Sequence, residues 1–302
     1  MSKIKTIDLT KKYDDFVAND RINLSVEPGE IKCIVGENGA GKTTLMNMLY
    51  GIHKPSSGKI LVDDKEVSFN SPQDAMRHGI GMVHQHFKLV ESLTVYENIF
   101  LGAEILKKGT PFIDRKAEIE KVNELIETYH FQVNPNDIVY NTSVGMRQQI
   151  EILKMLYRNV DTLILDEPTS VLTPQEVDRL IANLRNLRDG GKTIIVITHK
   201  LREVMELSDT VTVIKAGKVV GEVNTCDTNE KELAQMMVGR AVVLTVQNDG
   251  DPSNIGDACY EVKDLCTKNQ LGKQVVDHVS FTVRSGEVLG IAGVEGNGQS
   301  EL

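Results

Sequence analysis

The chain has 302 residues, of which 40% are hydrophobic and 25% charged, values typical of a folded globular protein with one large or two ordinary domains. Its formal net charge of -9 argues against a general nucleic-acid binder, because affinity for a phosphate backbone depends on clustered lysine and arginine. The 4 cysteines are spaced unsuitably for a zinc site, and no apolar run approaches the roughly 18 residues that span a bilayer. If the protein works at a membrane, we expect it to do so through partners.

Strand patterns dominate the first part of the chain, in the short stretches "IKTIDL", "RINLSV", "IKCIV" and "GKILVDD". A helical pattern follows in "DRKAEIEKVNELIETYHF" (residues 114–131). Its apolar residues recur at intervals of three and four and are Ile119, Val122, Leu125, Ile126 and Tyr129. This period predicts an amphipathic helix whose apolar face packs on the rest of the domain.

Strands and helices alternate again over residues 162–198. The stretches "TLILD" and "KTIIVIT" are apolar without alternation, which is typical of parallel strands covered on both faces. Between them, a helix is predicted from the capping signals Thr173, Pro174 and Glu176, and Gly190 with Gly191 is expected to end it. The sequence therefore predicts an α/β fold with a helical insertion near residues 85–160.

A phosphate-binding loop is predicted at "GENGAGKTT" (Gly36–Thr44), which matches the pattern G-x-x-x-x-G-K-[ST]. The strand "IKCIV" precedes it and the helical stretch "KTTLMNMLYG" follows it, as the pattern requires. Glycines let backbone N–H groups wrap the phosphates, Lys42 reaches the β- and γ-phosphates, and the Thr43 hydroxyl can bind Mg²⁺. This combination predicts nucleotide binding.

Three further side chains stand at strand ends. The strand "TLILD" delivers Asp166, which can hold the magnesium shell, and Glu167 follows it, placed to polarise an attacking water. His199 in "VITHK" follows the next apolar strand, where it can contact the γ-phosphate and orient the water. Together with the phosphate loop, these residues are the candidates for hydrolysis.

The end of the chain repeats an earlier part. The stretch "INLSVEPGEIKCIVGENGAGKTTL" (Ile22–Leu45) aligns without a gap onto "VSFTVRSGEVLGIAGVEGNGQSEL" (Val279–Leu302). The polar stretch "VQNDGDPSNIGD" separates the two copies and looks like a linker. We expect a first domain at residues 1–240, a linker at 241–258, and the beginning of a second copy, truncated early, at 259–302.

The ordered motifs of residues 1–240 resemble those of ABC-type ATPases, the nucleotide-binding subunits of transporters. This resemblance implies a P-loop fold with a RecA-like α/β core, an antiparallel β subdomain and a helical subdomain, and it implies ATP and Mg²⁺ as ligands. Tyr13 in "TKKYDDF" would stack on adenine, and Gln85 in "GMVHQHF" would sense magnesium and water. The implied nucleotide-binding set is Tyr13, Gly36, Glu37, Asn38, Gly39, Ala40, Gly41, Lys42, Thr43, Thr44, Ser143 and Gly145. The implied catalytic set is Glu167, His199, Lys42 and Gln85, and the metal set is Thr43, Gln85 and Asp166.

The signature motif of the resemblance is degenerate. The family pattern L-S-G-G-Q stands here as "TSVGM" (Thr142–Met146), which keeps only Ser143 and Gly145. In this family the signature of one domain closes over the ATP held by the other, so a degenerate partner loop is expected. "GVEGNGQSEL" fulfils this, because Gln299 replaces the loop lysine and Ser300 the threonine. A preorganised donor on phosphate is worth roughly 3 kcal/mol, so we expect the second site to hydrolyse poorly.

An intact first loop paired with a lysine-free second loop resembles the tandem ATPases of simple-sugar and nucleoside importers. The stretches "EPTSVLTPQEV" and "MMVGR" point the same way, and nucleosides are favoured over simple sugars. The resemblance implies two transmembrane permease subunits and, indirectly, an extracytoplasmic substrate-binding protein or lipoprotein as partners, with no nucleic acid. It places the protein peripherally on the cytoplasmic face of the cell membrane, with Gln85 to Leu101 as the docking segment.

Two alternatives stay open. A soluble tandem ABC protein acting on ribosomes or DNA would carry two intact loops and basic linkers, and the acidic linker and Gln299 disfavour it. A truncated product would bind ATP but hydrolyse little, because the second signature, expected to close over Lys42, would lie beyond residue 302.

Overall fold

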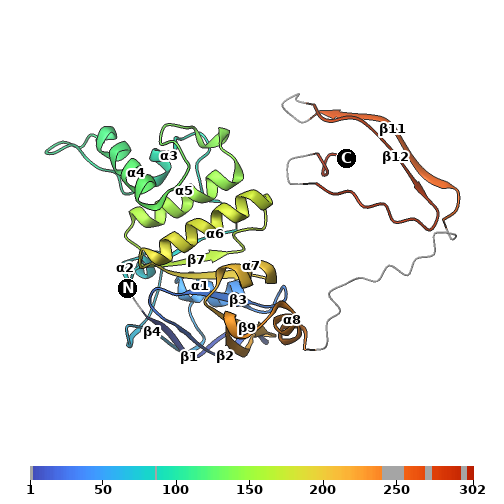
Figure 1. Ribbon diagram of the computed structural model, residues 1–302. Coiled ribbons are helices and arrows are strands. Elements are labelled where there is room, and N and C mark those ends of the chain that lie inside the picture. The colour runs from blue at the N-terminus through green and yellow to red at the C-terminus, as the bar shows by residue number, and fades with distance from the viewer. Residues whose placement is uncertain (1–2, 86, 240–254, 269–273, 294–297) are drawn as a thin grey trace. The chain divides into compact units, whose positions relative to one another are not determined.

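The computed structural model describes residues 3–85, 87–239, 255–268, 274–293 and 298–302, in two compact units, Met1–Val242 and Val243–Leu302 (Figure 1). Most of the linker expected at residues 241–258 lies outside the described residues, as do residues 294–297 of the second loop. Among the described residues, no helix is both long and apolar enough to cross a bilayer.

The first unit is built on a six-stranded, mainly parallel sheet. Its strand order is β10 (Lys218–Asn224), β9 (Thr210–Lys215), β3 (Ile31–Val35), β8 (Thr193–Thr198), β7 (Thr162–Asp166) and β6 (Ile80–Val83). β10 pairs antiparallel with β9, and the other pairs are parallel. Every residue of β3, β7 and β8 is buried, which is consistent with their mainly apolar sequences. The carboxyl ends of β3, β7 and β8 therefore meet at one edge of the sheet.

The first unit also contains a second sheet, which is antiparallel. Its order is β2 (Phe16–Val26), β1 (Ile4–Tyr13), β4 (Ser57–Val62) and β5 (Lys65–Val67). Helix α1 (Lys42–Leu49) lies between the two sheets. One buried hydrophobic cluster contains Leu24 of β2, Leu45 of α1 and Ile164 of β7. The helix that follows the phosphate loop is thus fixed from both sides.

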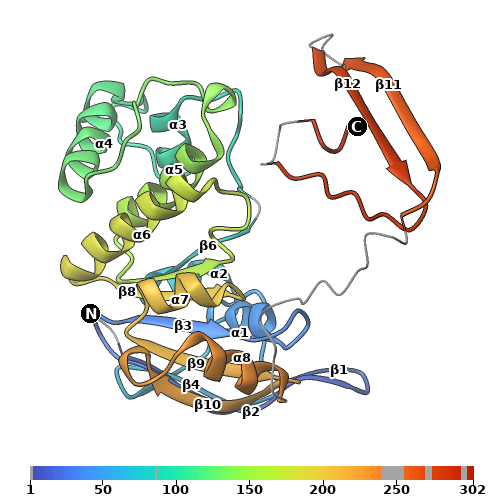
Figure 2. The same cartoon turned by 45° about the vertical axis from the view of Figure 1, so that its right-hand side comes forward.

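The remaining helices are α2 (Pro72–Arg77), α3 (Val95–Phe100), α4 (Arg115–Tyr129), α5 (Val144–Tyr157), α6 (Pro174–Asp189), α7 (Leu201–Leu207) and α8 (Glu230–Val238). Helices α3, α4 and α5 gather at one end of the unit, away from the antiparallel sheet (Figures 1 and 2). They confirm the helical insertion expected near residues 85–160. In α4, Val122 and Leu125 are buried and Ile119, Ile126 and Tyr129 pack against the core, as the period predicts.

Helix α6 follows its capping signals closely. Thr173 and Glu176 form a reciprocal capping box, with Pro174 at the first helical position. At the other end Gly190 keeps a φ of -75°, and Gly191, with a φ of 88°, supplies the left-handed residue. The α/β core with an antiparallel β subdomain and a helical subdomain confirms the predicted fold class.

The second unit contains a hairpin that copies β1 and β2. Strand β11 (Ala258–Lys268) pairs antiparallel with β12 (Gln274–Arg284), with its irregularities at the same places as in the first hairpin. Thus Leu265 faces Val279 where Leu9 faces Ile22 in the first hairpin. The left-handed residues also recur, since Asp8 and Arg21 (φ 46° and 49°) match Asp264 and His278 (φ 54° and 50°).

The second hairpin also holds the second loop as the first hairpin holds the first. Gly41 (φ 98°) lies so close to the Ala18 carbonyl oxygen that a Cβ atom there would overlap it. Gly298 (φ 90°) lies equally close to the carbonyl oxygen of Val275, which aligns with Ala18. The internal repeat seen in the sequence therefore extends to backbone packing.

Candidate functional site

The predicted phosphate loop lies between β3 and α1, at the carboxyl edge of the parallel sheet. Lys42 is 6% exposed, and its Nζ donates to the carbonyl oxygens of Gly36 (2.8 Å) and Glu37 (2.9 Å). Burial lowers the pKa of Lys42, and the nearby carboxylates of Glu167 and Asp166 partly offset this. Two of the three ammonium protons thus have neutral carbonyl acceptors, which charged phosphate oxygens can replace.

The loop is anchored to β2 by a residue whose role the sequence reasoning missed. The buried side chain of Asn19 donates from Nδ2 to the carbonyl oxygen of Gly41, at 3.1 Å. In the second unit Val276 stands at the equivalent place and offers no such donor. The second loop therefore differs from the first at this anchor as well as at residue 299, where glutamine stands in place of lysine.

Asp166 ends β7 beside the start of α1. Thr43 Oγ1 donates to Asp166 Oδ1 at 3.5 Å, and Asp166 is 7% exposed. Burial raises the pKa of Asp166, since its effect and that of Glu167 outweigh the hydrogen bond from Thr43 and the charge of Lys42. A carboxylate and a hydroxyl oxygen at this spacing fit the preference of Mg²⁺ for hard oxygen ligands.

Glu167 and His199 form a pair next to these residues. Glu167 takes a left-handed conformation, with a φ of 46°, and its N–H donates to the Ile197 carbonyl oxygen of β8 at 2.9 Å. Its Oε1 lies 3.1 Å from Nδ1 of His199, which follows β8. Backbone strain in a carboxylate residue at a sheet edge is typical of a functional position.

An open cavity of about 500 Å³ brings most of the predicted residues together. It is lined by Phe16, Ala18, Asn38, Gly39, Gly41, Lys42, Thr43, Thr44, Gln85, Asp166 and Glu167. The predicted residues Gly36, Glu37 and Ala40 belong to the loop without lining this cavity, and His199 reaches it through Glu167. The site therefore combines a loop, two strand ends and Gln85, which follows β6.

Two aromatic residues meet at the tip of the first hairpin. Tyr13, the residue expected to stack on adenine, does not line the cavity, and its ring lies edge-on to His53 at 5.9 Å and 5.0 Å from Lys11 Nζ. Phe16, directly opposite Tyr13 in the strand register, is 64% exposed and does line the cavity. The sequence reasoning missed Phe16, although an exposed aromatic residue near a phosphate loop is a usable signal.

We expect Phe16→Ala to weaken ATP binding about tenfold, because stacking of a base on an aromatic ring contributes ~1–3 kcal/mol. Isothermal titration with MgATP measures the change, and Tyr13→Ala, measured alongside, tests the assignment made from the sequence. An unchanged dissociation constant in Phe16→Ala would remove Phe16 from the site, and a loss in Tyr13→Ala would support stacking by Tyr13.

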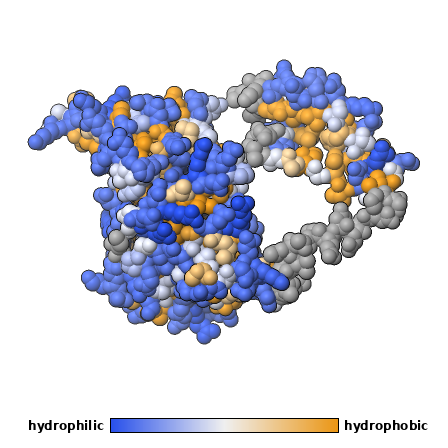
Figure 3. All heavy atoms as spheres, in the orientation of Figure 1, coloured by the Kyte–Doolittle hydropathy of each residue, from blue (hydrophilic) through white to orange (hydrophobic). Residues whose placement is uncertain are grey.

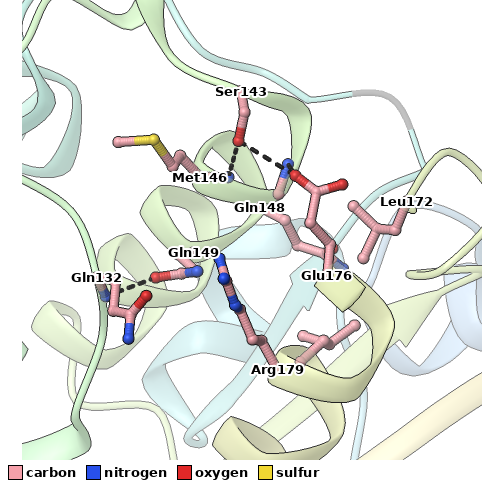
Figure 4. Close-up of a pocket in the computed structure, with 10 residues that line it drawn as sticks. Gln132, Ser143, Met146, Gln148, Gln149, Leu172, Glu176 and Arg179 are labelled. Carbon is pink, nitrogen blue, oxygen red and sulfur yellow. Dashed lines mark hydrogen bonds between the residues drawn. The ribbon is translucent and has the colours of Figure 1, made fainter. Parts of the chain in front are cut away.

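The degenerate signature lies elsewhere in the first unit, at the N-terminus of α5. It borders a separate cavity of about 250 Å³ between α5 and α6 (Figure 4). Ser143 caps α5 by accepting from the Met146 N–H, and Ser143 Oγ donates to Glu176 Oε1 at 3.2 Å. The N–H of Gly145 donates to the same oxygen at 3.3 Å. Ser143 and Gly145 thus stand apart from the residues that line the loop cavity.

Glu176 joins two helix ends, which the capping pattern alone did not reveal. Its Oε2 accepts from the N–H and hydroxyl of Thr173 in α6, while its Oε1 accepts from Ser143 and Gly145 of α5. Burial by itself raises the pKa of Glu176, but these hydrogen bonds outweigh it and hold the pKa below its ordinary value. A side chain at residue 145 would collide with this carboxylate unless Glu176 moved, so this arrangement of Glu176 depends on the glycine.

Comparison with known proteins places this geometry in a family. The model of the family described as ABC transporter matches residues 19–170. A solved structure, cbiO1 from Clostridium perfringens, part of the ABC transporter complex cbiONQ, superposes with a TM-score of 0.65 at 30% identity. The match covers 78% of this chain and 92% of that one.

Two longer relatives are similar over almost the whole chain. The nucleoside import ATP-binding protein NupA of Lactococcus lactis subsp. cremoris (strain MG1363) is 47% identical over 99% of this chain. The guanosine import ATP-binding protein NupO of Bacillus subtilis (strain 168) is also 47% identical over 99% of this chain. The chain spans 58% of the length of each of these relatives.

Proposed function

Because the chain belongs to the ABC transporter family, we propose that it is the ATP-binding and ATP-hydrolysing subunit of an importer for nucleosides or simple sugars. The observation that carries this proposal is the convergence of Lys42 with Asp166 and Glu167, from two distant places in the sequence, on one cavity beside the phosphate loop. The names of the two relatives, which refer to nucleoside and guanosine import, support the importer class.

The loop binds the phosphate groups of ATP. The Lys42 ammonium exchanges its present carbonyl partners for phosphate oxygens, which also accept hydrogen bonds from N–H groups of the loop, and these charge-assisted bonds are stronger. Thr43, Asp166 and Gln85 would hold Mg²⁺, which would neutralise negative charge on the phosphate groups. The loop thereby fixes the γ-phosphate next to Glu167.

Hydrolysis is assigned to the pair of Glu167 and His199. Glu167 lines the cavity and its carboxylate accepts a proton from a water positioned against the γ-phosphate. His199, 3.1 Å from that carboxylate, holds it in orientation. The strained backbone of Glu167 is held by its hydrogen bond to Ile197, so the carboxylate is positioned before ATP binds.

A second nucleotide site is proposed at the lysine-free loop of the second unit, and Ser143 and Gly145 of the first unit are proposed as nucleotide-binding residues. Val276 at the anchor position and Gln299 at the lysine position both weaken that loop for phosphate. On this proposal the second site binds nucleotide and contributes little hydrolysis. The domain limits expected from the sequence are part of the same proposal.

Two permease subunits are proposed to dock on the helical end of the first unit, together with Gln85. This end exposes apolar side chains, at Val90, Leu101, Leu106, Phe112, Ile113, Ile138 and Tyr140. Figure 3 shows apolar atoms interrupting the hydrophilic surface there. Such a patch is typical of a protein interface, and Gln85 connects it to the nucleotide cavity. The subunit would act peripherally, on the cytoplasmic face of the cell membrane, with an extracytoplasmic binding protein or lipoprotein supplying the substrate.

The cargo is proposed to be a nucleoside, with simple sugars as the second candidate. Disruption of the gene should abolish uptake of radiolabelled guanosine and leave ribose uptake intact. A copy of the gene with Lys42→Ala should fail to restore guanosine uptake. Loss of ribose uptake alone would assign a sugar importer. If neither uptake changes, the importer proposal is wrong.

A further inference from the structure

The second hairpin carries a cluster of metal-binding side chains. The sulfur of Cys266 and ligand atoms of Asp277 and His278 lie within 4.8 Å of one another, and all three residues are exposed. Cys266 belongs to β11, whereas Asp277 and His278 belong to β12. The three residues meet where the strand pairing is irregular, between Leu265 and Thr267. Such an irregularity allows side chains that are neighbours in sequence to lie on the same face of the hairpin.

This set of ligands is not a consequence of the hairpin fold. The first hairpin has the same irregularity, and there the Arg21 N–H donates to Thr10 Oγ1 at 3.0 Å. In the second hairpin the His278 N–H donates to Cys266 Sγ at 3.2 Å, in the same arrangement. The backbone is thus shared, but a hydroxyl and a guanidinium are replaced by a thiol and an imidazole. Thiolate and imidazole are ligands for zinc-like metals, and guanidinium is not.

The orientation of the imidazole is suited to metal binding. Asp264 Oδ1 lies 2.5 Å from His278 Nδ1, which leaves Nε2 as the ligand atom. Nε2 lies 3.7 Å from Asp277 Oδ1, close to the separation of about 3.4 Å between two ligands of a tetrahedral Zn²⁺. A carboxylate that fixes the far nitrogen of a ligating histidine is a common feature of zinc sites. Because the side chains are exposed, rotation about their bonds can bring the sulfur to bonding distance.

We propose that Cys266, Asp277 and His278 form a site for Zn²⁺ or a similar divalent transition metal, with Asp264 orienting the histidine and water completing the coordination. The mixed thiolate, imidazole and carboxylate set favours such a metal over Mg²⁺ or Ca²⁺, which prefer oxygen ligands alone. The metal links β11 to β12 across the hairpin. Since a two-stranded hairpin is marginally stable by itself, a metal that binds its folded form stabilises it.

Cobalt is the probe for this site, because a Co²⁺–thiolate bond gives a charge-transfer absorption in the near ultraviolet. We expect the reduced chain to develop this band on titration with CoCl₂, and ZnCl₂ to displace it. Cys266→Ser should abolish the band and His278→Ala should reduce Co²⁺ affinity at least tenfold. Asp264→Asn should reduce it about tenfold, as is typical of residues that orient a metal ligand.

Cys259→Ser is the matched control, because Cys259 is an exposed cysteine on the same strand and lies outside the cluster. It should leave the band and the Co²⁺ affinity unchanged. Amide hydrogen exchange gives a second readout, in which ZnCl₂ should slow exchange in β11 and β12 of the wild type but not of Cys266→Ser. A band that persists in Cys266→Ser, or no band in the wild type, would overturn the proposal. Neither result bears on ATP binding.

Discussion

Lys42→Ala is expected to weaken ATP binding about 100-fold, because a hydrogen bond to a charged group is worth roughly 1.5–3 kcal/mol and the lysine makes more than one. The side chain is 6% exposed and held at the loop by two carbonyl oxygens, so it is already placed where the phosphates arrive. Isothermal titration of the chain with MgATP measures the change in dissociation constant.

Gln299→Ala provides the matched control for this experiment, since residue 299 occupies the lysine position of the second loop. We expect it to change the affinity of the tight site by less than twofold, because residue 299 belongs to the second loop and its neutral amide adds no positive charge toward the phosphates. Circular dichroism should show that both variants are folded. Equal losses in the two variants, or an unchanged affinity in Lys42→Ala, would contradict the assignment of the first loop as the principal site.

Much of the fold followed from local patterns. Continuous apolar stretches predicted the parallel strands β7 and β8, and the capping residues of α6 predicted its first turn, because these signals depend on near neighbours in the chain. The limits of the first hairpin were less accurate. The stretches "IKTIDL" and "RINLSV" are parts of strands that run to Tyr13 and from Phe16, since pairing across the hairpin extends them.

The candidate site was predictable where one motif contains its residues, as in the phosphate loop, or where they stand at or directly after the end of an apolar strand, as with Asp166 and His199. Contacts between distant segments were not. Phe16 enters the cavity through the turn of a hairpin, and Glu176 reaches Ser143 across 33 residues of chain. No spacing rule in the sequence covers such contacts, because tertiary packing alone decides them.

The cysteines illustrate the same limit. Counting their spacing argues against a zinc site, since such a rule considers cysteines that are close in sequence. The hairpin instead places Cys266 beside His278 of the paired strand. The cluster of one cysteine, one histidine and one aspartate that we propose as a metal site is therefore recognised only once the strand register is known.

Glu167→Gln is expected to reduce ATP hydrolysis by about 10²–10⁴-fold, which is the usual contribution of a general base. The amide keeps the shape of the side chain and can still accept a hydrogen bond from His199, but it cannot take a proton from water. ATP binding should be retained, because the phosphate contacts come from the loop and from Lys42. Phosphate release by the full-length subunit assembled with its permeases measures the rate, and titration with ATP measures the affinity.

Glu203→Gln tests whether loss of a nearby negative charge is sufficient to slow hydrolysis. Glu203 is a mostly buried carboxylate of α7 that accepts from Thr169 and pairs with Lys200, and it does not line the nucleotide cavity. We expect the Glu203→Gln variant to hydrolyse ATP at close to the wild-type rate, because Thr169 and Lys200, the partners of Glu203, do not line the nucleotide cavity. Should Glu167→Gln keep the wild-type rate, or both variants slow equally, proton transfer to Glu167 would be excluded as the chemical step, and the strain at residue 167 would need another explanation.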